Sequence, residues 1–130
     1  MYKIWGTTET IYSCPSVTRH RISIKANYHC SIHYHKHKNN IFEVTSGELA
    51  VIIYEGRSYS FVLLGPGDYY NVPPMVLHSF YAMSNVSAYE IYNASIGQDV
   101  DDNDIIRLND GGICVDLETY VRSTNYYIRQ

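Results

Sequence analysis

The feature that most constrains the fold of this 130-residue chain is a series of short β-type segments separated by turn residues. Glycine, proline, asparagine and serine stand between these segments, and no long stretch keeps the period of an amphipathic helix. Many short strands at close spacing predict an all-β protein, built as an antiparallel sandwich or barrel. The expected strands are Arg21–Ala26, Ile41–Thr45, Glu48–Tyr54, Ser58–Leu64, Asp68–Val72, His78–Met83 and Val86–Asn93.

Composition indicates a folded domain and argues against nucleic-acid or membrane binding that is driven by bulk charge. Apolar residues make up 45% of the chain, and the net charge of -3 includes no basic stripe for nucleic acid or an anionic membrane surface. No apolar run approaches the roughly 18 residues that a membrane helix needs. The chain begins without a basic region followed by an apolar stretch, and its three cysteines suit a reducing compartment. We therefore predict one cytoplasmic domain over residues 1–130, with its barrel at about residues 20–95.

The predicted core follows from the apolar positions of these strands. The secondary structure of the end of the chain is less determined by the sequence. The segment Ile113–Gln130 fits an edge strand or a short helix around Leu117–Val121. An exposed edge strand must be covered or paired, so we expect a homodimer. The predicted core residues are Ile24, Leu49, Val51, Ile53, Phe61, Val72, Phe80 and Ile91.

Four histidines lie close together between positions 29 and 37, and two of them, His33 and His35, are separated by one residue. Alternate residues of a strand share a face, so both imidazoles can reach one divalent metal if a third ligand comes from another strand. Imidazole suits several transition metals, and the cluster does not name one. The alternative is a solvated, histidine-rich end of a hairpin.

The spacing around these histidines resembles the two motifs of the cupin superfamily. The short segment Glu48–Pro66 separates the motifs, as is usual in that family. Trp5-Gly6 and the sequence Asp104–Arg107 match the borders of its small mannose-6-phosphate-isomerase-like group, and the resemblance covers about residues 3–112. The first motif is His33-x-His35-x4-Asn40-x6-Gly47, and the second is Gly67-x5-Pro73-x-Met75-x2-His78.

The resemblance implies a double-stranded β-helix, the cupin jelly-roll barrel, with a divalent metal such as Zn, Mn, Fe or Ni held by His33, His35 and His78. Asn40 stands where the family has a fourth ligand, a glutamate. An amide oxygen can ligate a metal but carries no charge, so we expect weaker binding. Asn27 and Met75 occupy positions where glycine is usual, and Asn27 tolerates the positive φ that such a turn needs.

Other ligand sets stay open at this point. Glu43 is a substitute for the missing glutamate, although Phe42 and Val44 indicate that even positions face inward and that Glu43 faces solvent. A shifted pairing would use His35, His37 and Glu43. Otherwise His37 belongs to a loop or rim, while His29 is a candidate for the barrel entrance and His20 for the surface.

The resemblance implies an isomerase or epimerase that acts on a sugar or sugar phosphate. Such a reaction needs a base and a cation that stabilises the developing oxyanion. Glu90 is our candidate base, because similar cupins carry a glutamate on the strand after the last histidine. The alternatives are a cupin dioxygenase-type metal enzyme and a non-catalytic module that binds a sugar or another small molecule. The candidate substrate-binding residues are Tyr70, Tyr81, Tyr92 and Lys25.

Overall fold

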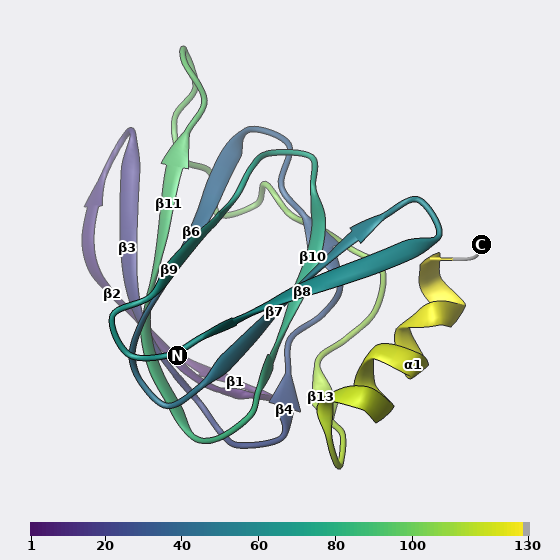
Figure 1. Cartoon of the computed structure of the whole chain (residues 1–130). Coiled ribbons are helices and arrows are strands. Elements are labelled where there is room, and N and C mark those ends of the chain that lie inside the picture. The colour runs from purple at the N-terminus through teal and green to yellow at the C-terminus, as the bar shows by residue number, and fades with distance from the viewer. Residues whose placement is uncertain (129–130) are drawn as a thin grey trace.

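The computed structural model describes residues 1–128, which form two facing β-sheets of antiparallel strands and one helix (Figure 1). The predicted all-β barrel of two sheets is confirmed. The first sheet has the strand order β1-β2-β3-β11-β6-β9. Its strands are β1 (Tyr2–Lys3), β2 (Gly6–Cys14), β3 (Val17–Ile24), β11 (Val86–Ala94), β6 (Lys38–Ser46) and β9 (Tyr69–Val72).

The second sheet is organised around one central strand, β10. Two short strands, β4 and β5, pair with β10, and β7 joins it to β8. Two further short strands from the end of the chain extend this sheet, with β12 on β5 and β13 on β4. The strands are β4 (Tyr28–His29), β5 (His33–Tyr34), β7 (Leu49–Glu55), β8 (Ser58–Leu64), β10 (Leu77–Ala82), β12 (Ile106–Arg107) and β13 (Gly112–Ile113).

Apolar side chains at alternate strand positions fill the space between the sheets. Phe42 and Phe80 meet edge to face with ring centroids 5.9 Å apart, and Trp5 packs on Phe80 at 5.2 Å. The predicted core positions Ile24, Leu49, Val51, Ile53, Val72 and Phe80 all lie in this cluster.

Two predicted core residues lie outside it, and strand parity explains both. Phe61 is 45% exposed, because Val62 and Leu64 are the β8 side chains that turn inward. Ile91 is only half-buried, because Glu90 and Tyr92 are the β11 side chains that turn toward the barrel interior.

Three tight turns hold the strands in register. Gly47 has φ 82°, and a Cβ at this position would lie 2.1 Å from the carbonyl oxygen of Asn85, so only glycine fits. Asn27 and Met75 also adopt positive φ, at 73° and 68°. The sequence expectation of a left-handed turn at Asn27 is therefore met, and Met75 makes the same turn despite its longer side chain.

The end of the chain forms a helix, α1 (Leu117–Ile128), which packs on the outer face of the second sheet (Figure 1). Asp116 caps it by accepting a hydrogen bond from the backbone amide of Thr119. Buried Tyr120 donates a hydrogen bond to Ser79 of β10. Of the two predicted alternatives the helix forms, and it extends beyond the predicted Leu117–Val121, whereas β13 includes only Ile113 of the predicted segment. The last two residues of that segment, 129 and 130, lie outside the described residues. No helix within residues 1–128 is long and apolar enough to cross a membrane.

The packing predicts unequal costs for two phenylalanine substitutions. Phe42 is fully buried, so Phe42→Ala should lower the free energy of unfolding by about 3–5 kcal/mol through lost burial and a residual cavity. Phe61→Ala, at an exposed position, should cost roughly 1 kcal/mol or less. Urea unfolding of both variants checks this, and equal costs would contradict the assignment of Phe61 to the outer face.

Candidate metal centre

Three buried histidines converge inside the barrel from two strands that are far apart in the sequence. His33 opens β5 and is the register partner of His78 on β10, and His35 directly follows β5. The candidate ligand nitrogens of the three rings lie within 4.8 Å of one another. Within residues 1–128, no other set of three histidine, cysteine or carboxylate side chains comes this close. The structure therefore brings together the three histidines that the motifs single out.

Backbone carbonyls fix the orientation of each ring. The Nδ1 atom of His33 donates to the Ser31 carbonyl at 2.8 Å, that of His35 to Asp104 at 2.7 Å, and that of His78 to Val76 at 2.8 Å. A carbonyl only accepts, so each Nδ1 carries the proton and each Nε2 presents a lone pair. This is the arrangement by which proteins hold histidine ligands for metals.

Asn40 completes the group from β6. Its Nδ2 donates to the Glu90 carboxylate at 3.1 Å, which directs Oδ1 toward His78, and Oδ1 lies 3.0 Å from the His78 Nε2. Because Nδ1 of His78 carries the proton that it donates to Val76, Nε2 of His78 is an acceptor. Two acceptors, this Nε2 and the Asn40 Oδ1, therefore face each other 3.0 Å apart. The His35 Nε2 is also buried and has no hydrogen-bond partner. A cation among these atoms would satisfy all of them, so the residues present fit a bound divalent metal.

Burial keeps the three imidazoles neutral. It lowers the pKa of His78 from 6.5 to about 4. Burial also lowers the pKa of His33 well below its usual value, and repulsion from His78 and His35 lowers it further. The pKa of His35 is lowered by burial as well, although its bond to the Asp104 carbonyl opposes this. At neutral pH the ring lone pairs are therefore free for a metal rather than occupied by protons.

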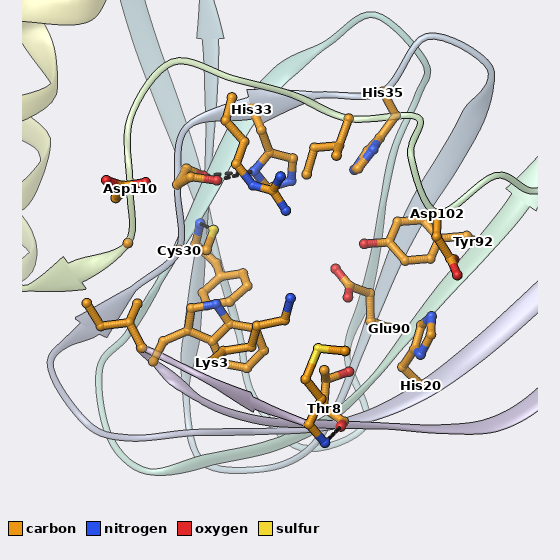
Figure 2. Close-up of a pocket in the computed structure, with 18 of the residues that line it drawn as sticks. Lys3, Thr8, His20, Cys30, His33, His35, Glu90, Tyr92, Asp102 and Asp110 are labelled. Carbon is orange, nitrogen blue, oxygen red and sulfur yellow. Dashed lines mark hydrogen bonds between the residues drawn. The ribbon is translucent and has the colours of Figure 1, made fainter.

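The histidine cluster opens into a pocket of about 680 Å³. His33 and His35 lie on one side of it, and Glu90, Tyr92 and His20 lie on another, with the Glu90 carboxylate directed into the space (Figure 2). The Tyr92 hydroxyl donates a hydrogen bond to Glu90, and burial together with the Glu90 charge raises the pKa of Tyr92 well above 10. Glu90 is thus hydrogen-bonded to Asn40, one of the four candidate metal ligands, and linked through its amide to the histidine cluster.

Only some of the predicted substrate residues reach this pocket. Glu90 and Tyr92 line it. Tyr81 turns to the opposite face of β10, where it is buried beside Tyr120 of the helix and donates to the Cys114 carbonyl. Tyr70 packs against the apolar core, and Lys25 is exposed beside the Tyr28 ring. These three residues are not among those that line the pocket.

The alternative ligands lie elsewhere. His37 is exposed in the loop before β6, and Glu43 is half-buried on the opposite face of β6 from Phe42. His29 does not line the pocket, because its ring stacks on Tyr120 at 4.2 Å under the helix. His20, expected at the surface, instead lines the pocket and bonds the Thr10 hydroxyl at 3.0 Å.

The sequence interpretation missed the residues that reach the pocket from outside the central barrel strands. Lys3 and Trp5 come from the N-terminal arm, and Arg107 comes from β12. Lys38, at the start of β6, is buried with its ammonium group 4.0 Å above the Tyr92 ring. Trp5 and Arg107 belong to the border sequences that matched the cupin group. This match was the sequence signal that could have pointed to them as pocket residues.

Comparison with known proteins defines the class. The sequence matches the family described as mannose-6-phosphate isomerase C-terminal over residues 1–110, so the chain belongs to that cupin-type family. The helix α1 lies beyond the matched part. A search of the curated proteins found no match.

Solved structures with the same fold are cupins of low sequence identity. Oxalate decarboxylase from Bacillus subtilis is 16% identical, with a TM-score of 0.69 over 83% of this chain and 29% of the decarboxylase chain. KdgF from Halomonas sp. is 16% identical, with a TM-score of 0.61 over 67% of this chain and 78% of that one. A cupin-2 domain protein from Shewanella frigidimarina is 17% identical, with a TM-score of 0.58 over 67% and 79%. This chain thus spans under a third of the oxalate decarboxylase, of which another structure is described by its Mn(II) centres.

The ligand geometry predicts that one histidine substitution abolishes metal binding and a neighbouring one does not. His78→Ala removes a buried ligand and should weaken Mn²⁺ or Zn²⁺ affinity by at least about 100-fold, without loss of the fold. His37→Ala is the matched control, because His37 lies in the exposed loop. The metal affinity of this variant should equal that of the unsubstituted protein. Equilibrium dialysis with metal analysis measures both, and a reversed result would favour the set His35, His37 and Glu43.

Proposed function

We propose that this protein is a metal-dependent cupin enzyme that moves a proton next to a carbonyl group of a sugar or sugar phosphate, as an isomerase or epimerase. His33, His35, His78 and Asn40 hold the metal, and Glu90 is the catalytic base. The observation that carries the proposal is the pair of acceptors on His78 and Asn40, 3.0 Å apart, with Glu90 hydrogen-bonded to the same amide.

The donor set suits a divalent transition metal. Three imidazoles and one amide oxygen are all neutral, and imidazole binds Zn, Mn, Fe and Ni. The Mn(II) centres of oxalate decarboxylase support a metal of this kind in this fold. When bound, the metal supplies a Lewis acid that polarises a carbonyl oxygen and stabilises negative charge on it.

Glu90 is well placed to take and return the proton. The Asn40 amide and the Tyr92 hydroxyl both donate to its carboxylate and so fix its orientation. A base held in this way next to the metal ligands can remove a proton from the carbon beside a carbonyl. In an isomerase it delivers this proton to the former carbonyl carbon while the hydroxyl proton moves to the former carbonyl oxygen, and in an epimerase the proton returns to the opposite face of the same carbon. Asn40 therefore links the metal ligands to the base, because its Oδ1 faces His78 and its Nδ2 donates to Glu90.

The walls of the pocket suit a polyhydroxylated substrate. Thr10, His20 and Tyr92 offer hydrogen-bonding groups, and Trp5 and Phe80 offer aromatic surface on which a sugar ring can pack. The volume of about 680 Å³ lies in the range of small-molecule sites. A homodimer remains a prediction. It is supported by β8, which pairs only with β7 among the described strands and exposes Tyr59, Phe61 and Leu63.

The catalytic role of Glu90 predicts a loss of proton exchange without a loss of metal. Glu90→Gln keeps the size of the side chain and removes the base, so exchange should fall by about 100-fold or more. The assay incubates metal-loaded protein with aldoses, ketoses and their phosphates in D₂O, and follows deuterium incorporation and sugar interconversion by NMR. Metal affinity, measured in parallel, should stay within a few-fold.

Two outcomes of this assay would overturn the proposal in favour of the alternatives. Oxygen consumption by an iron-loaded protein with no exchange on any sugar would indicate a dioxygenase-type enzyme. Sugar binding with neither exchange nor oxygen consumption would indicate a non-catalytic binding module.

The neutral ligand at position 40 generates a further prediction. Asn40→Glu supplies the charge that the family usually has, so metal affinity should rise several-fold or more. In the metal-free protein the same change loses the hydrogen bond to Glu90 and places two carboxylates together, so stability should fall by about 1–3 kcal/mol. Thermal unfolding with and without Mn²⁺ measures both effects.

The matched control for this prediction is the exchanged pair Asn40→Glu with Glu90→Gln. The new amide at position 90 can donate to the new carboxylate at position 40, so the metal-free protein should recover most of its stability. An Asn40→Glu protein that is destabilised and gains nothing from any metal would contradict the metal-dependent enzyme.

A further inference from the structure

Two cationic side chains line the pocket without a counter-ion. Arg107 comes from β12 and Lys3 from β1. Within residues 1–128, neither side chain forms an ion pair or a hydrogen bond. The other cations that line the pocket have hydrogen-bond partners. The ammonium group of Lys38 donates to the Asp101 carbonyl and lies over the Tyr92 ring, and the N-terminal ammonium of Met1 donates to the Thr8 carbonyl.

Arg107 lies directly beside the histidine cluster. Strand β12 pairs with β5, and Arg107 is the register partner of His33. Burial and the neighbouring histidines lower the pKa of His33 most, and the guanidinium charge lowers it slightly further. The same charge weakly opposes the burial that raises the pKa values of Cys30 and Tyr92. Its field therefore reaches the pocket interior although the side chain remains accessible to solvent.

The carboxylates of the pocket do not neutralise these two cations. Glu9 is paired with Arg21 at 3.3 Å, and Glu90 is held by Asn40 and Tyr92. Asp102 and Asp110 are exposed at the rim, and neither forms an ion pair with Arg107 or Lys3. The candidate metal ligands add no negative charge, because all four are neutral. Among the described residues, Arg107 and Lys3 are thus cations of this pocket with which no carboxylate forms an ion pair.

We propose that Arg107, beside the three-histidine cluster, and Lys3, which reaches the same pocket from β1, form an anion-binding subsite, and that the substrate carries a carboxylate or phosphate group that docks there. This inference rests on the proposed function and specifies the class of substrate for it. An arginine binds either group through two parallel hydrogen bonds, and a lysine adds a point charge. Figure 2 shows the side chains of Lys3 and Glu90 both directed into the pocket, so an anionic group held by Lys3 and Arg107 shares this pocket with the proposed base.

The test titrates chelator-treated protein with inorganic phosphate and with malonate, and uses mannose as a neutral comparison. Trp5 lines the same pocket and is the single tryptophan of the chain, so its fluorescence reports binding. Arg107→Gln and Lys3→Gln should each weaken the binding of phosphate, of malonate or of both by about tenfold, and the double variant should abolish it. The anion that binds identifies the group on the substrate.

The matched controls are Arg57→Gln and Lys25→Gln, which remove the same charges from exposed positions outside the pocket and should bind like the unsubstituted protein. The proposal is overturned if neither anion binds, or if the double variant retains the original affinity. The titration contains no metal, so its failure leaves the metal site and Glu90 to their own tests. Metal affinity measured in Arg107→Gln should remain unchanged, which separates an anion subsite from a general disturbance of the histidine cluster.

Discussion

The two acceptors that face each other across 3.0 Å, Nε2 of His78 and Oδ1 of Asn40, are the central constraint of this structure. Each is locked in that role by a bond on its other side, the ring by the Val76 carbonyl and the amide by the Glu90 carboxylate. Neither group can rotate to donate to the other without breaking a partly buried hydrogen bond, which costs free energy. A cation satisfies both at once, and the unpartnered His35 Nε2 lies beside the same space.

The barrel serves this constraint by bringing distant segments to one place. β5 and β10 pair so that His33 lies next to His78, and β6 and β11 pair so that Asn40 lies opposite Tyr92 and near Glu90. The segment after the barrel braces the ligands from outside. The Asp104 carbonyl holds the His35 ring, while its carboxylate accepts hydrogen bonds from the backbone amides of Lys36 and His37. Asp104 thereby holds both the His35 ring and the loop that follows it. Residues that hydrogen-bond to a metal ligand from outside commonly orient that ligand in this way.

Much of the fold was predictable from the sequence, because the seven expected strands show β-rich runs that end at turn residues. β2 was missed, since most of its side chains are exposed and it lacks alternation of apolar and polar residues. The three histidines were predictable from motif spacing. Tyr81 was misplaced although parity predicts its position, because Phe80 and Ala82 on the same strand share the inward face with His78. Lys3 could not be placed in the pocket from the sequence, and Arg107 had only its border motif as a signal, since the pairing of β1 and β12 at the sheet edges brings these residues there.

The central claim is that His33, His35, His78 and Asn40 hold one divalent metal, and anomalous diffraction from crystals grown with Co²⁺ or Mn²⁺ tests it most directly. The account predicts a single anomalous peak inside the barrel, within about 2.0–2.3 Å of the three Nε2 atoms and of the Asn40 Oδ1. The Glu90 carboxylate should then remain bonded to the Asn40 amide and outside the ligand set. A peak bound instead by His20, His37 or Glu43, or no peak at metal concentrations that load other cupins, would contradict the account.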